Sequence, residues 1–399
     1  MMNLPKVTVV GQGYVGLPLA LALSDYGYFV TGYDIDPEKV SMINQGISPI
    51  EDIENEHLLD LIVKGNYRAS SEKDAISNSD IYIVCVPTPI TQNKEPDLSY
   101  VEAAAELIGK NLSRSNMVIV ESTIAPGTTR NFILPILLKL SGLKIDDFDL
   151  CFSPERIDPS NKNWNITNTP KIIAGLSEDS KERGYAFYSR IIKEVIRTPS
   201  LEVAETAKLL ENTFRFINIS FINEVLIFCE KLGIEVNDVI EASATKPYGF
   251  MKFKPSLGIG GHCIPVDPFY LSDAAKNLNL PMSFIDAAGV INANMPLHFV
   301  NRARLILKEI VNKKILILGV AYKPNVSDVR ETPVKTLIEI LRSEGAIVNW
   351  HDDLVVSWMN EKSSDISGDY DLAILATNHS YFQLEALGSV PILNTNKST

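Results

Sequence analysis

A glycine-rich turn between two apolar stretches, VTVVGQGYVGLPLALAL, opens the chain. Gly11, Gly13 and Gly16 form the pattern G-x-G-x-x-G between a predicted strand and a predicted amphipathic helix. Such a turn brings the backbone close to a diphosphate, which can lie at the positive N-terminus of the helix. The sequence therefore predicts a dinucleotide-binding βαβ unit at this end of a parallel sheet.

Asp34 ends the next predicted strand, FVTGYD, and follows Gly16 by eighteen positions. A carboxylate there can accept hydrogen bonds from the adenosine ribose and repel a 2′-phosphate, which favours NAD over NADP. The alternative is that the glycines serve only helix–strand packing and that Asp34 is a turn residue.

Strand-like and helical segments alternate along the rest of the chain. The segments IYIVCVP, MVIVEST and DLCFSPE continue the first alternation, residues 201–232 keep apolar helical spacing for about nine turns, and KKILILGVAY opens a second alternation. We expect an α/β fold of two Rossmann-like domains with parallel sheets, joined by a long central helix and a helical dimerisation region. The predicted domains are residues 1–198, 199–310 and 311–399.

The composition narrows the class of protein further. A length of 399 residues suits several domains, and the formal charge of −12 argues against a general nucleic-acid binder. There is no apolar run long enough to span a membrane and no signal-peptide pattern, so we expect a cytoplasmic protein. The four cysteines lie far apart and form no C-x-x-C pair, which predicts reduced thiols and no metal site.

One cysteine has an unusual setting. Cys263 lies in GIGGHCIPVD, where glycines permit close backbone approach and Asp267 follows four residues later. This loop suits a nucleophile, although a cysteine is more often a small buried hydrophobe. The neighbouring His262 either lowers the pKa of the thiol or packs within the loop.

Seven motifs follow one another in the order GQGYVGLPLA, VCVPTP, ESTIAPGTT, FSPER, AETAKLLENTFR, GIGGHCIPVDP and GVAYKPNVSDVRETP. Together they resemble the UDP-glucose/GDP-mannose dehydrogenase family across nearly the whole chain. The resemblance implies an NAD-dependent, four-electron oxidation of the C6 alcohol of a UDP-linked sugar to a carboxylate.

By this resemblance, Cys263 is the nucleophile that traps the aldehyde and then holds the carbon as a thioester. Glu155 is the expected general base for hydrolysis, and it positions the water together with Thr123. The simpler alternatives are a loop carboxylate for Glu155 and a helix-capping hydroxyl for Thr123.

The resemblance also implies that three further residues lie around the reacting carbon of the sugar: Lys208, Asn212 and Asp267. Lys208 and Asn212 are four residues apart on the predicted central helix, so they share one face and can meet one oxyanion. Without the resemblance, Lys208 would be read as a solvated residue paired with Glu205 or Glu211.

Binding residues follow from the same resemblance. The expected cofactor contacts are Gly11, Gly13, Tyr14, Val15, Gly16, Asp34, Val86, Pro87, Thr88, Thr123 and Arg330. The expected substrate contacts are Glu155, Arg156, Ile157, Lys208, Asn212, Gly260 and Lys323. For Arg330 the alternative is a surface salt bridge with Asp328 or Glu331.

Some segments also indicate which sugar the chain would oxidise within this family. The segments KEPDLSYV, SPERIDPSNKNWNITNTPKIIAG and GGHCIPVDPFYL are most similar to the branch that acts on UDP-N-acetylhexosamines, especially UDP-N-acetylglucosamine. Val266 stands where UDP-glucose dehydrogenases commonly carry lysine. UDP-glucose and UDP-N-acetylmannosamine stay open as substrates, as do a single-step alcohol dehydrogenase and a non-catalytic nucleotide-sugar sensor. The long helix and the family resemblance imply a homodimer or a higher homo-oligomer.

Overall fold

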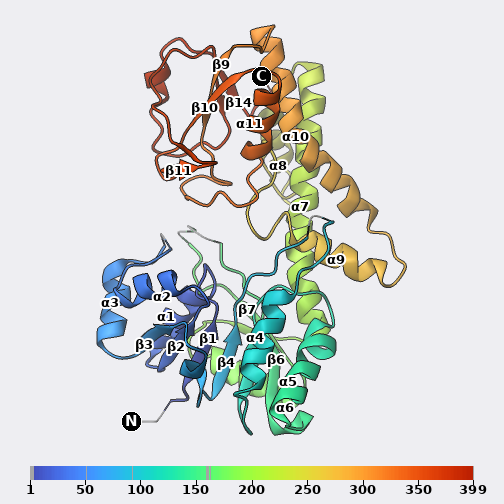
Figure 1. Ribbon diagram of the computed structural model, residues 1–399. Helices are drawn as coiled ribbons and strands as arrows, with labels where there is room; N and C mark the ends of the chain where they lie inside the picture. The colour runs from blue at the N-terminus through green and yellow to red at the C-terminus, as the bar shows by residue number, and fades with distance from the viewer. Residues whose placement is uncertain (1–3, 51, 92, 159–160, 162, 399) are drawn as a thin grey trace. The chain divides into compact units, whose positions relative to one another are not determined.

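The computed structural model describes residues 4–50, 52–91, 93–158, 161 and 163–398, which fold into two compact units (Figure 1). The first unit spans Met1–Leu210 and Phe269–Asn277, and the second spans Glu211–Pro268 and Leu278–Thr399. The chain therefore passes between the units more than once.

The first unit contains an eight-stranded sheet with the order β3-β2-β1-β4-β5-β6-β7-β8. Its strands are β1 (Val7–Val10), β2 (Val30–Tyr33), β3 (Tyr67–Ser70), β4 (Ile81–Val84), β5 (Met117–Val120), β6 (Asp149–Phe152), β7 (Lys171–Gly175) and β8 (Val195–Arg197). All neighbouring strands are parallel except β6 and β7, which pair antiparallel. The strand order reverses its direction of growth at β1, as in dinucleotide-binding sheets.

Helices cover both faces of this sheet. They are α1 (Gly16–Tyr26), α2 (Pro37–Asn44), α3 (Asn55–Val63), α4 (Ser99–Gly109), α5 (Leu134–Ser141) and α6 (Glu178–Tyr188), with α9 (Asp267–Lys276) starting at the unit boundary. Shorter turns of helix lie at Lys73–Ile76, Thr129–Ile133 and Ile145–Asp147. One buried cluster joins alternate strand residues to α1, α3 and α6, and the other joins the opposite strand face to α4, α5 and the start of the long helix α7. Strands with both faces covered are apolar throughout, which explains the runs VTVV, IYIV and MVIV.

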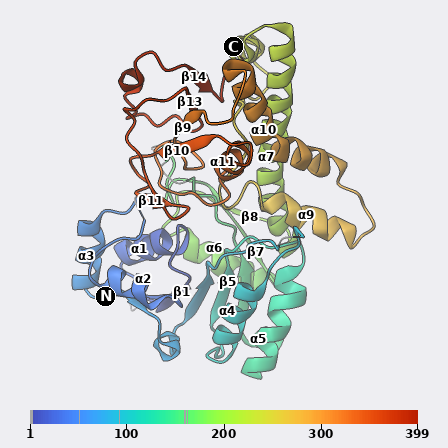
Figure 2. The same ribbon diagram turned by 45° about the horizontal axis from the view of Figure 1, so that its top comes forward.

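The second unit is built on a smaller parallel sheet with the order β10-β9-β13-β14. Its elements are β9 (Lys314–Leu318), β10 (Ile347–His351), β13 (Leu372–Leu375), β14 (Ile392–Asn394), the hairpin strands β11 (Ser357–Trp358) and β12 (Glu361–Lys362), the helices α8 (Val236–Ala244), α10 (Ser283–Leu307) and α11 (Val334–Ser343), and a 3₁₀ turn at Leu384–Leu387. One face of the sheet packs on α11, α10, α8 and the second half of α7. The C-terminal half of α10, which carries Met295, Phe299 and Ala303, runs beside α7 in both views (Figures 1 and 2).

A single helix, α7 (Leu201–Leu232), begins in the first unit and ends in the second. Its 32 residues far exceed the usual helix length of about eleven or twelve residues. Gly233 follows it with a positive φ of 72°, the left-handed conformation that commonly terminates helices. The long helix predicted at residues 201–232 is confirmed, and so are the α/β class and the Rossmann-like organisation.

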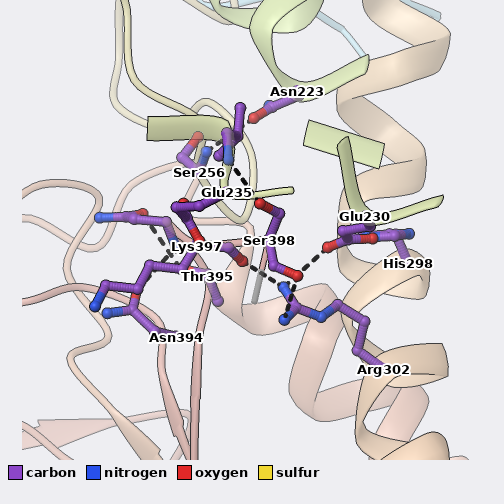
Figure 3. Close-up of polar contacts among 12 residues, drawn as sticks. Asn223, Glu230, Glu235, Ser256, His298, Arg302, Asn394, Thr395, Lys397 and Ser398 are labelled. Carbon is purple, nitrogen blue, oxygen red and sulfur yellow. Dashed lines mark hydrogen bonds and ion pairs between the residues drawn. The ribbon is translucent and has the colours of Figure 1, made fainter. Parts of the chain in front are cut away.

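The last described residues of the chain are tied to α7, α8 and α10 within the second unit (Figure 3). Arg302 on α10 pairs with Glu230 on α7 at 2.9 Å and also donates to the Lys397 carbonyl at 2.6 Å. The Ser398 hydroxyl accepts from the Val236 amide at 2.7 Å. These bonds fix the end of the chain against the helices that cover the small sheet.

Among the described residues, every helix is too short or too polar to serve as a membrane span. The cytoplasmic location stays a prediction.

Candidate active site

The glycine turn follows β1, and its three glycines have different structural duties. Gly11 has a φ of 95°, and a Cβ atom there would lie 2.4 Å from the Cys85 carbonyl oxygen. A Cβ atom on Gly16 would lie 1.8 Å from the Gly11 carbonyl oxygen. Around Gly13, by contrast, the Cβ position has no described atom within 4 Å. Gly11 and Gly16 are required by the fold itself, whereas the space beside Gly13 is open to a ligand.

Asp34 follows β2 and is 6% exposed. One carboxylate oxygen accepts from the Gln12 amide at 2.8 Å and from the Lys39 ammonium at 2.9 Å, and the other accepts from the Asp36 amide at 3.0 Å. The Gln12 side chain is fixed in turn by the Tyr67 hydroxyl at 2.8 Å. The carboxylate is thereby held beside the glycine turn, in the place where a ribose contact is expected.

The remaining predicted cofactor residues of this unit lie at the same edge of the sheet. In the parallel register Val10 pairs with both Tyr33 and Val84, and Val84 pairs with Val120. The segments after these strands therefore meet at one edge. Those segments carry Tyr14, Val15, Val86, Pro87, Thr88 and Thr123. The open side of Gly13 and the fixed carboxylate beside it fit a dinucleotide.

Glu155 and Lys208 are together in the first unit. Glu155 lies in the segment after β6 and is 9% exposed, and Lys208 lies on α7 and is 5% exposed. The Lys208 ammonium donates to the Glu155 carbonyl at 2.7 Å and lies 3.8 Å from its carboxylate. Glu205 instead accepts from the Gly127 and Thr129 amides at 2.6 and 2.9 Å. The alternative pairing of Lys208 with Glu205 is therefore wrong, and Glu205 rather than Thr123 bonds the amides at the helix start after PGTT.

A second buried ion pair lies next to Glu155 and was missed by the sequence analysis. Lys171, the first residue of β7, pairs with Glu121 at 2.9 Å. A small pocket in this unit is lined by Glu121, Glu155, Arg156, Ile157, Ile166, Thr169, Pro170 and Lys171. Three predicted substrate residues, Glu155, Arg156 and Ile157, therefore share one pocket. Charged residues next to apolar strands, in IVEST and PKIIAG, were the available signal.

Cys263 lies in the second unit with Asp267 and Asn212. The Cys263 carbonyl accepts from the Asp267 amide at 2.8 Å, and the Asp267 carboxylate accepts from the Asn212 side-chain amide at 2.5 Å. Asp267 is 2% exposed, whereas Cys263 is partly exposed. The thiol-bearing turn is thereby anchored to α7 through a carboxylate and an amide.

The glycines of the Cys263 loop allow it to pack against the loop after β9. A Cβ atom on Gly260 would lie 2.9 Å from the Glu331 carbonyl oxygen, and one on Gly261 would lie 2.9 Å from the Tyr322 ring. The Gly261 amide also donates to the Arg330 carbonyl at 3.1 Å. The loop that carries Lys323 and Arg330 therefore lies against the loop that carries Cys263.

The charges around His262 favour one of the two roles considered for it. Burial lowers the pKa of this imidazole, and the nearby Arg330 charge lowers it further, while Asp328 raises it. A lowered pKa disfavours the imidazolium form that could stabilise a thiolate, which favours the loop-packing role. Arg330 makes the salt bridge with Asp328 that was considered as the alternative to a cofactor contact, at 2.7 Å. Its cofactor contact stays a prediction.

A buried pair of an aspartate and a histidine is hydrogen-bonded to the loop after β9. Asp352 and His379, 1% and 2% exposed, follow β10 and β13 and pair at 3.0 Å. The other imidazole nitrogen, Nδ1, accepts from the Asn325 amide at 2.9 Å. Burial would raise the pKa of Asp352, but hydrogen bonds from His379 and the Val320 amide hold it below its usual value. The sequence analysis did not single out either residue.

The structure therefore gathers the predicted residues in two groups that belong to different units. Gly11, Gly13, Gly16, Asp34, Glu155 and Lys208 belong to the first unit. Asn212, Gly260, Cys263, Asp267, Lys323 and Arg330 belong to the second.

Family models match three stretches of the chain. Residues 5–195 match the NAD binding domain of the UDP-glucose/GDP-mannose dehydrogenase family, residues 202–294 match its central domain, and residues 316–392 match its UDP binding domain.

Individual relatives are similar over almost the whole chain. A UDP-N-acetyl-D-glucosamine 6-dehydrogenase of Pseudomonas aeruginosa is 34% identical over 395 residues, covering 95% of this chain and 91% of that protein. A UDP-N-acetyl-D-mannosamine dehydrogenase of Pyrococcus horikoshii is 32% identical over 387 residues, covering 95% and 90%. A solved structure of the UDP-D-ManNAc dehydrogenase from Pyrococcus horikoshii has a TM-score of 0.91 at 30% identity, covering 99% of this chain and 96% of that one.

Proposed function

Because this chain belongs to the UDP-glucose/GDP-mannose dehydrogenase family, we propose that it oxidises the C6 hydroxyl of a UDP-N-acetylhexosamine to a carboxylate, with UDP-N-acetylglucosamine as the first candidate. The chain is an NAD-dependent UDP-sugar dehydrogenase. The identity of the sugar and the covalent route are the proposed parts.

The observation that carries the covalent route is the setting of Cys263. A partly exposed thiol lies on a glycine-rich turn that is anchored through Asp267 to Asn212. The other three cysteines are buried, and burial raises the pKa of Cys85, Cys151 and Cys229. Of the four cysteines, all of which the structure describes, Cys263 alone combines access with a fixed turn, as a nucleophile requires.

When bound, NAD supplies the hydride acceptor, and oxidation of an alcohol to a carboxylate consumes two equivalents. The Gly11–Gly16 turn and Asp34 are the residues that would hold it, because the open side of Gly13 admits a diphosphate and Asp34 presents a fixed carboxylate to a ribose. The chain's own residues carry the remaining duties.

In the proposed chemistry, the Cys263 sulfur adds to the C6 aldehyde carbon, so that no free aldehyde is released. After the second oxidation the same carbon is held as a thioester. A water molecule then attacks the acyl carbon, and one of its protons passes to the Glu155 carboxylate while the other stays on the new hydroxyl group. The carbon–sulfur bond breaks to give the carboxylic acid and the Cys263 thiolate, and the acid then loses its proton to water to become the carboxylate. Lys208 and Asn212 supply donors for the oxyanion.

The choice of sugar rests on similarity. The motifs around KEPDLSYV and GGHCIPVDPFYL favour a UDP-N-acetylhexosamine, and relatives named for UDP-N-acetyl-D-glucosamine and UDP-N-acetyl-D-mannosamine are 34% and 32% identical to this chain. These identities are too close to separate the two sugars. UDP-N-acetylmannosamine is therefore the second candidate, and UDP-glucose the third.

The amount of NADH formed per sugar consumed tests the function directly. Purified protein with excess NAD would be given UDP-N-acetylglucosamine, UDP-N-acetylmannosamine and UDP-glucose separately. Two NADH per sugar with one of them supports the four-electron oxidation and identifies the substrate. One NADH per sugar would replace it with a single-step alcohol oxidation, and binding without turnover would favour a sensor.

We also propose that two copies of the chain pair along α7. In the second unit this helix exposes Phe214, Phe221, Phe228 and Leu232, and the last three are each more than half exposed. The three phenylalanines repeat every seven residues, so they form one apolar stripe along the helix. A row of exposed aromatic side chains is costly in water and suits an interface with a second copy.

A further inference from the structure

Two buried lysines donate to consecutive carbonyl groups of the FSPER segment. The Lys208 ammonium donates to the Glu155 carbonyl at 2.7 Å, and the Lys171 ammonium donates to the Pro154 carbonyl at 3.3 Å. Both lysines are less than 10% exposed. The backbone on either side of the Glu155 amide is therefore held by two positive charges that come from different elements.

Lys171 is itself fixed by two further buried residues. Glu121 pairs with its ammonium at 2.9 Å and is 2% exposed. The Tyr188 hydroxyl donates to the other Glu121 oxygen, and the Tyr188 ring lies 4.9 Å from the ammonium. Burial raises the pKa of Tyr188, and Glu121 raises it further, so the hydroxyl keeps the proton that it donates.

These three residues come from separate parts of the first unit. Glu121 directly follows β5, Lys171 begins β7, and Tyr188 ends α6. The FSPER segment is bonded to the start of β7 at two more points, because the Ser153 hydroxyl donates to the Ile172 carbonyl at 2.7 Å and Arg156 donates to the Pro170 carbonyl at 3.0 Å. These two bonds tie the residues on both sides of Glu155 to Pro170 and Ile172.

Hydrolysis of a thioester requires that its general base be held in a fixed position, and the contacts around Glu155 can provide this. A general base works only within a narrow range of positions relative to its water, and Glu155 lies in a loop rather than on a regular element. A buried ion pair is also a poor source of net stability, because two charges must be removed from water to form it. The pair of Glu121 and Lys171 lines the same pocket as Glu155.

We propose that Glu121, Lys171 and Tyr188 are positioning residues that hold the Glu155 carboxylate in place for hydrolysis of the Cys263 thioester. This inference rests on the proposed function. The step that they serve is redox-neutral: water oxygen bonds to the acyl carbon, its proton goes to Glu155, and sulfur leaves as the thiolate. Loss of the positioning set slows this step and leaves the two oxidations intact.

The test compares E121Q/K171M with the unaltered protein. This double variant removes both charges together, so neither is left buried and unpaired, and the amide oxygen of the introduced glutamine can still accept from the Tyr188 hydroxyl. NADH release is followed by rapid mixing, and the sugar bound to Cys263 is measured by intact-protein mass spectrometry after acid quenching. Steady-state turnover is expected to fall about 10- to 100-fold. The initial NADH burst should stay, with covalent adduct accumulating on Cys263.

A matched control removes another ion pair from the same unit. Asp149 and Arg183 pair at the opposite end of β6 from the FSPER segment, so D149N/R183M perturbs the same strand without touching Glu155. The control should turn over at close to the rate of the unaltered protein. K171R keeps a positive charge beside Glu121 and should retain part of the hydrolysis rate.

Three results would overturn the inference. A folded E121Q/K171M protein that hydrolyses its adduct at the unaltered rate would show that Glu155 needs no such support. An equal slowing in D149N/R183M would reduce the effect to general stability. If E155Q forms no adduct and the unaltered protein yields one NADH per sugar, the proposed function itself fails, and the inference fails with it.

Discussion

The amide of Asn325 donates to His379 Nδ1 at 2.9 Å, and this bond joins the loop that carries Lys323 to a buried carboxylate beneath it. Asn325 has a φ of 63°, a left-handed conformation that asparagine tolerates better than most residues. The opposite ring nitrogen of His379 lies 3.0 Å from Asp352. The imidazole thus bridges the strand ends to the loop predicted to contact the UDP-sugar.

His379→Leu removes both bonds of this bridge. A leucine side chain has neither a donor for Asp352 nor an acceptor for the Asn325 amide. Each lost bond should cost about 1–2 kcal/mol, and the KM for the UDP-sugar is expected to rise roughly fivefold to tenfold while the KM for NAD stays constant. Steady-state kinetics with each substrate varied in turn make the measurement. His57→Leu, which alters an exposed histidine of the first unit, is the control.

The glycine turn predicts different defects at two positions. Gly13→Val adds a side chain where the described structure has open space, so the protein should fold normally but bind NAD at least tenfold more weakly. Gly16→Ala places a carbon against the Gly11 carbonyl and should destabilise the fold by several kcal/mol. Thermal unfolding and titration with NAD distinguish them. Equal loss of stability in both variants would contradict the assignment.

Cys263→Ser removes the thiol and keeps a hydroxyl of similar size. The four-electron turnover should fall by about 10³-fold or more, because an alcohol is a far weaker nucleophile than a thiolate. NADH formation with UDP-N-acetylglucosamine, measured beside Cys229→Ser as a buried-cysteine control, tests this. Full turnover by Cys263→Ser would exclude the thioester.

His262 should make the stability of the protein depend on pH. Its pKa is lowered in the folded protein by burial first and by Arg330 second, and the unfolded value is about 6.5. As the pH falls below about 6.5, the unfolded chain takes up a proton at this residue before the folded protein does, so folding is weakened. His262→Gln should therefore lose less free energy of unfolding between pH 7.5 and pH 5.5 than the unaltered protein. Equal losses, measured by denaturant unfolding at both pH values, would contradict this account.

Charges placed in the apolar stripe of α7 should separate the proposed dimer. Phe221→Glu combined with Phe228→Glu puts two like charges on the exposed face of the helix, where each would have to be buried without a partner in an interface. Sedimentation equilibrium is expected to give twice the chain mass for the unaltered protein and the chain mass for the variant. Glu224→Gln on the same helix is the control, and a monomeric unaltered protein would contradict the proposal.

Local sequence patterns predicted much of the fold and the position of the cofactor turn. Local sequence was enough to predict the roles of Gly11 and Gly16 and the helix at residues 201–232, because a turn and a helix are specified by residues close together in the chain. The antiparallel pairing of β6 and β7 was not, because strand direction depends on how distant segments meet. A purely parallel first sheet was the expectation, and this one pair departs from it.

The charged residues behind the candidate site were missed for the same reason. Glu121 and Lys171 are fifty positions apart, and the sequence offers no period that links them. For Lys208, local sequence offered only a pair with the nearest acidic residues along the helix, and the role near Glu155 came from the family resemblance alone. Its contact with Glu155 joins residues 53 positions apart.

The continuity of α7 has a consequence for how this chain can vary. Lys208 lies before the unit boundary and Asn212 after it, on one uninterrupted helix. An α-helix turns by about 100° per residue, so a single inserted or deleted residue between them would rotate one side chain about a quarter-turn away from the other's face. The two side chains keep their common face only if the helix between them keeps its length. The number of residues between Lys208 and Asn212 is therefore constrained, whichever residues occupy the positions between them.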